Sequence, residues 1–140
     1  MADTSRREVT LERLEEGVYL AHNTRGGRLR LGSKAGEDFT PVELLLAAIA
    51  GCSAVDVDVV TGRRSPAESF GARVEAEYVR DEGGNILRDI TLTFAITFPA
   101  DEAGDAAREI LPRAARTSHD RTCTVSRTIE AGTPVRVVVG

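Results

Sequence analysis

The fold is decided by the stretch Thr40-Pro-Val-Glu-Leu-Leu-Leu-Ala-Ala-Ile-Ala-Gly-Cys-Ser-Ala-Val-Asp-Val57. Thr40 has an N-cap residue type, Pro41 stands at the first helical position and Glu43 at the third, which together make a capping box with its favoured proline. The apolar residues that follow predict a helix from Pro41 to about Thr61, with Gly62 as its terminator. The middle of this helix is rich in small residues, which let another backbone approach closely. We therefore expect the helix to pack against a second helix or its own symmetry mate, and to be buried on nearly all sides.

Strand patterns precede the helix. Polar and apolar residues alternate over residues 8–14, and shorter strands are predicted at residues 18–22 and 28–31. Gly17 and the turn sequence Asn23-Thr-Arg-Gly-Gly27 separate these strands. The region before the helix is therefore predicted to be a meander of three short antiparallel strands.

A hairpin and a second helix are predicted after the first helix. Residues 70–79 and 86–98 alternate strongly around the turn sequence Asp81-Glu-Gly-Gly84, which predicts two long paired strands. Helical spacing returns from Asp101 to about Arg116, and Val135–Val139 is expected to close the chain as a strand. The order βββ–α–ββ–α–β, joined mostly by hairpins, predicts an α+β fold with antiparallel sheet structure.

Size, charge and composition limit the class of protein. A chain of 140 residues fits one domain, residues 1–140. The formal net charge of −4 argues against nucleic acid as a partner, because phosphate binding needs a basic face. The N-terminus lacks the apolar segment of a secretion signal, and Glu43, Asp56 and Asp58 interrupt the apolar stretch from Val42 to Val60. We therefore expect a cytoplasmic protein that neither enters nor spans a membrane. The aromatic content of only 4% favours an oligomer over a lone monomer.

Two cysteines, Cys52 and Cys123, are the candidates for chemistry. The simplest interpretation of each is a small buried apolar residue. Cys123, however, follows the polar segment His119-Asp-Arg-Thr122, and a partly exposed thiol near Arg121 would be reactive. A zinc site built from His119 and the cysteines lacks the usual CxxC or HxxxH spacing, and His22 is expected to be an ordinary strand residue. No metal and no cofactor are therefore predicted.

Two motifs resemble a known family. Pro41-Val-Glu-Leu-Leu-Leu-Ala-Ala-Ile-Ala-Gly-Cys-Ser-Ala-Val-Asp-Val57 resembles the hallmark of the OsmC and organic hydroperoxide resistance family, in which a Pro-x-Glu-Leu segment leads down a helix to the first cysteine. His119-Asp-Arg-Thr-Cys-Thr-Val-Ser-Arg-Thr-Ile129 resembles the second motif of that family, Cys-x-Val-Ser. The resemblance extends from about Val18 to Val139. It implies an OsmC-like α+β fold, in which antiparallel sheets formed by both chains surround two long central helices of an intertwined homodimer.

The resemblance also implies a thiol-dependent peroxidase that acts on organic hydroperoxides. Cys52 corresponds to the cysteine that peroxide oxidises to a sulfenic acid, and Cys123 to the resolving cysteine that condenses with it to a disulfide. A cellular dithiol would then reduce this disulfide. The family uses an Arg from the early strands, for which Arg25 is the nearest match and Arg28 the second.

The catalytic Glu of the family is where the sequence departs. That Glu directly follows the Pro, and here the position holds Val42, with Glu43 one residue further along. Glu43 is expected to act as the helix cap, and helical geometry puts it about 180° around the helix and roughly 13.5 Å along it from Cys52. Any catalytic role of Glu43 would therefore have to act across the dimer. The alternative function, favoured by Val42, is a non-catalytic dimeric module that binds a small apolar ligand.

Overall fold

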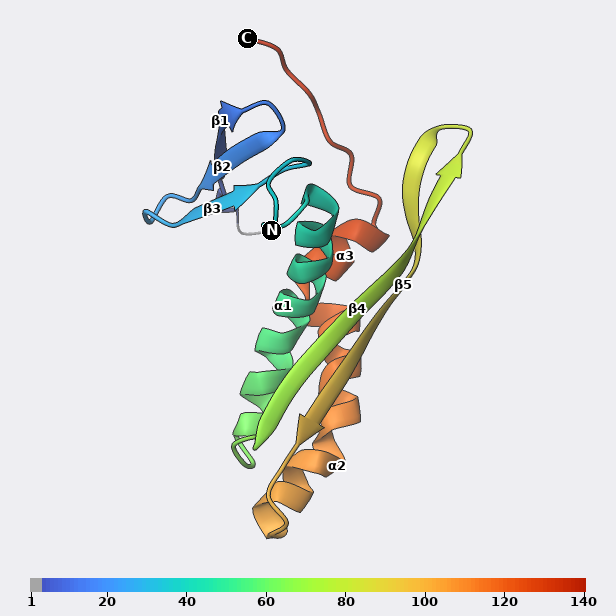
Figure 1. Ribbon diagram of the computed structural model, residues 1–140. Coiled ribbons are helices and arrows are strands. Elements are labelled where there is room, and N and C mark those ends of the chain that lie inside the picture. The colour runs from blue at the N-terminus through green and yellow to red at the C-terminus, as the bar shows by residue number, and fades with distance from the viewer. Residues whose placement is uncertain (1–3) are drawn as a thin grey trace. The chain divides into compact units, whose positions relative to one another are not determined.

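The computed structural model describes residues 4–140 of the chain, and the contacts between its Cα atoms divide the chain into two compact units. The first unit is Met1–Leu45 and the second is Leu46–Gly140. Helix α1 (Pro41–Gly62) begins in the first unit and continues into the second (Figure 1). Both candidate cysteines belong to the second unit.

The first unit contains the predicted meander. Its strands are β1 (Thr10–Glu15), β2 (Val18–His22) and β3 (Arg28–Leu31), and they form one antiparallel sheet in the order β1-β2-β3. Gly17 lies in the tight turn between β1 and β2 with a φ of 77°, a conformation that glycine adopts without strain. The prediction is confirmed, with β1 beginning two residues later than the alternation suggested.

The predicted capping box opens α1. The Thr40 hydroxyl accepts a hydrogen bond from the Glu43 N–H at 3.2 Å, and the Glu43 carboxylate accepts one from the Thr40 N–H at 2.9 Å. Each side chain thus satisfies a backbone donor that the first helical turn leaves without a partner. The predicted start of the helix is confirmed.

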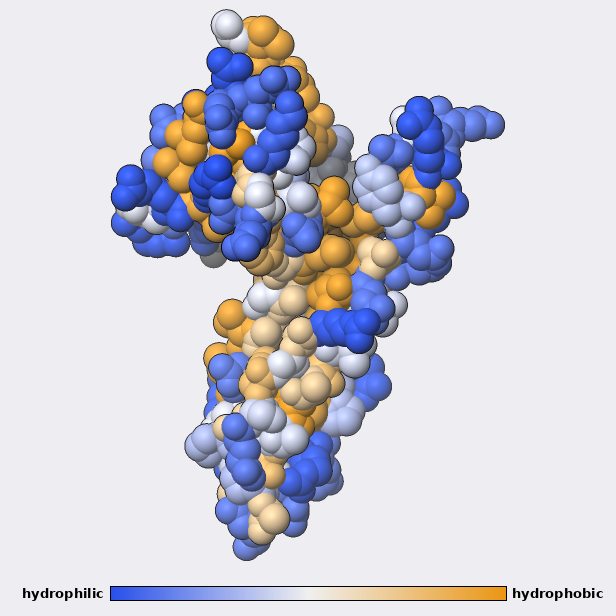
Figure 2. Space-filling view, viewed as in Figure 1, coloured by the Kyte–Doolittle hydropathy of each residue, from blue (hydrophilic) through white to orange (hydrophobic). Residues whose placement is uncertain are grey.

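Helix α1 buries only one face within the chain. Its buried residues recur every four positions, which places them along one stripe: Ile49, Ser53, Val57 and Thr61. On the other side Val55 and Val59 are more than half exposed, and Figure 2 shows apolar side chains at the surface over this helix. The expectation that α1 is buried on nearly all sides is therefore wrong for the single chain, because the chain supplies packing partners for one face alone.

The second unit contains the predicted hairpin. Strands β4 (Ser69–Asp81) and β5 (Gly84–Thr97) pair antiparallel along their whole length and form a second sheet (Figure 1). The register shifts where β5 carries one extra residue, and Asp89 there adopts a φ of 50°. A bulge of this kind bends and twists the hairpin locally.

Helix α2 (Glu102–Thr117) follows the hairpin. The Asp101 carboxylate caps it by accepting a hydrogen bond from the Gly104 N–H at 2.7 Å. The helix passes through Pro112 without interruption. Burial of Ala107 and Ala114 on either side of the proline holds both halves in one helix.

The chain then forms a π-helical turn, η1 (Ser118–Thr122), and the short helix α3 (Thr124–Glu130). The prediction of a closing strand at Val135–Val139 is wrong: this segment forms no strand, and its four valines are between 77% and 93% exposed. A strand needs a neighbour to complete its ladder of hydrogen bonds, and no strand among the described residues pairs with this segment. The two antiparallel sheets and the helices confirm the α+β class.

Candidate active site

The fold brings the two cysteines together. Cys52 lies in the middle of α1 and is half-buried, whereas Cys123 lies at the junction of η1 and α3 and is 0% exposed. Both thiols are free. The Cys52 thiol is among the groups that lower the pKa of the Cys123 thiol, so the two side chains are neighbours, and no disulfide joins them.

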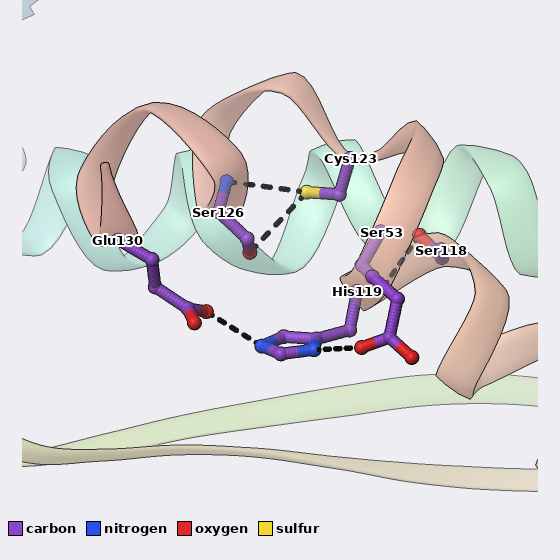
Figure 3. A network of polar contacts seen from close by, with 7 residues as sticks. Ser53, Ser118, His119, Cys123, Ser126 and Glu130 are labelled. Atoms are coloured by element: carbon purple, nitrogen blue, oxygen red, sulfur yellow. Dashed lines mark hydrogen bonds and ion pairs between the residues drawn. The ribbon is translucent and has the colours of Figure 1, made fainter. Parts of the chain in front are cut away.

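The Cys123 sulfur has several hydrogen-bonding partners (Figure 3). It lies 3.3 Å from the Ser126 hydroxyl oxygen and accepts a hydrogen bond from the Ser126 N–H at 3.5 Å, which caps α3. Burial raises the pKa of the Cys123 thiol. Interactions with the Ser126 side chain and backbone, the Cys52 thiol and the Val125 backbone outweigh burial, so the pKa lies below its ordinary value. Cys123 therefore ionises more readily than an ordinary buried thiol.

Asp56, one helical turn after Cys52, contacts both ends of η1. Its Oδ2 atom accepts hydrogen bonds from the Ser118 hydroxyl at 2.7 Å and from the Thr122 hydroxyl at 2.9 Å. The Ser53 and Ser118 hydroxyls also lie 3.1 Å apart, and both side chains are buried. By length and composition alone α1 could cross a membrane, but these bonds pack its Asp56 side against the rest of the second unit. In the sequence, Asp56 stands out only as a charge that interrupts the apolar stretch, and this role was not predicted.

His119 links η1 to α3. Its Nδ1 lies 2.8 Å from the Asp120 carboxylate and its Nε2 2.5 Å from the Glu130 carboxylate (Figure 3). The hydrogen bonds to Asp120 and then to Glu130 are the main causes that raise the pKa of His119 above its ordinary value. Within residues 4–140 no group of three His, Cys, Asp or Glu side chains is arranged to hold a metal ion.

A cavity of about 500 Å³ is lined in part by residues that lie next to the two cysteines in the chain or contact them. Its polar wall includes Ser53, which follows Cys52 in α1, and Ser126, which hydrogen-bonds Cys123. Its apolar wall comes from α1, β5, α2 and α3: Ile49, Leu87, Ile90, Leu92, Phe94, Ala115 and Ile129. Charged side chains complete the lining: Arg88, Asp89, His119 and Glu130. The cavity therefore offers an apolar wall to a small molecule beside polar and charged groups.

The other predicted residues lie in the first unit. Arg25 is exposed in the turn between β2 and β3, where its backbone N–H donates to the Asn23 side chain at 2.9 Å, and Arg28 is exposed at the start of β3. Glu43 is occupied by the capping box with Thr40. The catalytic roles of Arg25 and Glu43 stay predictions.

Comparison with known proteins gives one consistent result. The family model described as OsmC-like protein matches residues 34–138. A curated protein of Mycobacterium tuberculosis, described as uncharacterized, is 28% identical over 135 residues, which cover 94% of this chain and 95% of that protein. The crystal structure of a hypothetical protein from Aquifex aeolicus VF5 has a TM-score of 0.76 at 22% identity, covering 95% of this chain and 93% of that one. An organic hydroperoxide resistance protein OsmC from Legionella pneumophila has a TM-score of 0.59 at 18% identity, covering 91% of each chain. At these identities the two structures establish the fold.

Proposed function

Because this chain belongs to the OsmC-like family, we propose that it is a thiol-dependent reductase of organic hydroperoxides that uses two cysteines. The observation that carries the proposal is the pair of free neighbouring thiols, one half-exposed and the other buried with a lowered pKa. The solved relative from Legionella pneumophila is named as an organic hydroperoxide resistance protein, which supports this substrate class. The apolar wall of the cavity suits the carbon skeleton of such a substrate.

The first step takes place at Cys52. Its thiolate attacks the terminal oxygen of the hydroperoxide, the O–O bond breaks, and the alkoxide takes up a proton and leaves as an alcohol. Cys52 becomes a sulfenic acid, a two-electron oxidation of the sulfur. Cys52 is the better candidate for this step because it is half-exposed, whereas Cys123 is closed to the solvent.

The second step takes place at Cys123. Its sulfur attacks the sulfur of the Cys52 sulfenic acid, the S–S bond forms, and the S–O bond breaks with release of water. A lowered pKa suits an attacking thiol, because the thiolate is the nucleophile. A cellular dithiol then reduces the disulfide by exchange and restores both thiols.

We further propose that the working form is a cytoplasmic, intertwined homodimer with two long helices at its centre. The exposed apolar residues on α1, such as Val55 and Val59, support this assembly, as do the exposed valines of Val135–Val139. A second chain would cover the free face of α1 and supply a ladder partner for the C-terminal segment. In such a dimer Arg25 and Glu43 are the candidates for further catalytic contacts.

A second candidate function is a non-catalytic dimeric module that binds a small apolar ligand. Two observations favour it: the cavity of about 500 Å³ with its apolar wall, and Val42 at the position where the family has its catalytic Glu. This candidate needs no chemistry at either cysteine.

Intact mass after one equivalent of cumene hydroperoxide separates the two functions. The wild type should lose two hydrogens as the disulfide forms, and Cys52→Ser should keep its mass, because a serine hydroxyl is too poor a nucleophile at neutral pH. Cys123→Ser should gain one oxygen and, with excess peroxide, a second one as the sulfenic acid becomes sulfinic acid. If wild type and Cys52→Ser consume the hydroperoxide equally slowly in the presence of a dithiol, the reductase proposal is wrong and the ligand-binding module replaces it.

A further inference from the structure

We propose that Asp56 is the positioning residue of the second step, because its carboxylate holds both ends of the π-helical turn that presents Cys123 to Cys52. This inference rests on the proposed reductase function. It assigns to Asp56 control over how fast the disulfide closes, and therefore over how much of the Cys52 sulfenic acid is lost to further oxidation.

The contacts of η1 give Asp56 this position. Ser118 is the first residue of η1 and Thr122 the last, and both hydroxyls donate to the same carboxylate oxygen of Asp56. The Cys123 N–H donates to the Ser118 carbonyl at 2.7 Å, which closes the wide turn immediately before the sulfur. Single π-helical turns are rare and are frequently found at functional sites. Here the turn is fastened at its two ends to one side chain of another helix.

Helix α1 carries both Asp56 and Cys52, so it fixes the position of one relative to the other. Asp56 follows Cys52 by four residues, so the two side chains lie on the same face, about 6 Å apart along the axis. Because a helix is stiff, holding η1 against Asp56 also sets the place of Cys123 relative to Cys52. The buried pair of Ser53 and Ser118 hydroxyls attaches η1 to the same helix a second time.

The chemistry of the second step makes this placement matter. Disulfide formation needs Cα atoms within roughly 7 Å and a narrow range of dihedral angles. If η1 is attached more loosely, the Cys123 sulfur spends a smaller fraction of its time in a position from which it can attack. Disulfide formation is then slower. The sulfenic acid that waits longer reacts with a second hydroperoxide and becomes sulfinic acid, with the hydroperoxide itself as the oxidant. The attack of Cys52 on the hydroperoxide forms no bond to Cys123, so we expect its rate to be unchanged when the attachment of η1 is loosened.

Asp58 provides a matched control on the same helix. It is an exposed carboxylate two residues further along, so its removal changes the charge of α1 equally without touching η1. Asp56→Asn is the conservative variant, because an amide oxygen still accepts hydrogen bonds but without the charge that strengthens them.

The experiment follows both steps in the full chain. The wild type, Asp56→Ala, Asp56→Asn and Asp58→Ala are mixed with one equivalent of cumene hydroperoxide, quenched in acid at intervals, alkylated and weighed by mass spectrometry. Loss of free Cys52 should proceed at the same rate in all four proteins. Disulfide closure should be about tenfold slower in Asp56→Ala, intermediate in Asp56→Asn and unchanged in Asp58→Ala. With excess hydroperoxide the sulfinic acid fraction should rise in the same order.

The outcomes separate the two proposals. If the wild type forms no disulfide, the reductase function is wrong, and the inference on Asp56 is wrong with it. If the wild type closes its disulfide and Asp56→Ala closes it at the same rate, or slows both steps equally, only the inference on Asp56 is overturned. Should Asp56→Ala fail to fold, Thr122→Val removes one of the two hydrogen bonds from an exposed position, and about threefold slower closure is expected. Unchanged closure in Thr122→Val would then overturn the inference.

Discussion

Replacing Ser126 by alanine should change the rate of disulfide closure in opposite directions at low and high pH. The Ser126 hydroxyl lies 3.3 Å from the Cys123 sulfur and is among the causes that lower the pKa of Cys123. Ser126→Ala removes this bond and keeps the backbone hydrogen bond from residue 126. The pKa of Cys123 should therefore rise in the variant.

The size of the effect follows from the hydrogen bond. Bonds to charged acceptors contribute about 1.5–3 kcal/mol, and sulfur hydrogen-bonds more weakly than oxygen, which puts this bond at the lower end. Its loss reduces the thiolate fraction about tenfold at pH values below the pKa of Cys123 in both proteins. The thiolate that remains is more nucleophilic because its pKa is higher. With a Brønsted slope of about 0.4–0.5, the rate of attack per thiolate rises about threefold. Closure should therefore be about threefold slower at low pH.

At high pH the effect of Ser126→Ala on the rate of disulfide closure is reversed. Above the pKa of Cys123 in both proteins the thiol is fully ionised, so only nucleophilicity differs, and the variant should close up to about threefold faster. The assay uses excess hydroperoxide to make the first step fast, with acid quench, alkylation and intact mass at intervals from about pH 5 to about pH 10. Thr124→Ala, at an exposed hydroxyl on the same helix, is the control. A rate ratio that stays constant over this range would refute the role of Ser126 in the ionisation of Cys123.

Two further predictions concern stability and assembly. The raised pKa of His119 means that the folded chain holds this proton more tightly than the unfolded chain, so the stabilisation is complete below the ordinary value of 6.5 and is lost as the pH rises through the higher folded pKa. The free energy of unfolding of the wild type should therefore fall as the pH rises above 6.5, and His119→Gln should remove this fall. The fall should be no more than about 1 kcal/mol, because the ion pairs are exposed. Urea unfolding at a series of pH values measures it. Sedimentation equilibrium should show a dimer at micromolar concentration, and Val137→Lys should weaken it, because the variant adds charge to the exposed C-terminal segment; a folded monomer in the wild type would contradict the assembly.

The parts of the fold that could be predicted are those set by local sequence. The Thr40–Glu43 capping box and the turn between β4 and β5 depend on residues that are close in the chain, and both are present. The segment Val135–Val139 has the residue types of a strand, but strand formation also depends on a pairing partner, which local sequence does not reveal. Burial of α1 failed for the same reason, since composition shows that a face is apolar without showing what covers it.

The candidate site also has a part that the sequence predicted and a part that it did not. The pairing of Cys52 with Cys123 followed from the resemblance of two motifs, because spacing alone could not place them together. Asp56 went unrecognised because its partners, Ser118 and Thr122, lie 62 and 66 residues away. The one available signal was a carboxylate inside an apolar helix, one turn from a cysteine. A buried or half-buried charge in such a place needs partners, and only the fold shows which they are.

The contacts around the site favour the second step over the first. Asp56 ties η1 to α1, the His119–Glu130 pair ties η1 to α3, and Ser126 contacts the Cys123 sulfur directly. All three contacts act on the position or the ionisation of Cys123, whereas Val42 stands where the resemblance implies the carboxylate that assists the attack on peroxide. A chain with a slow first step and a prearranged second step spends little time as sulfenic acid. Under the proposed function, turnover is therefore expected to be limited by the reaction of Cys52 with hydroperoxide, and protection from over-oxidation to depend on the residues around Cys123.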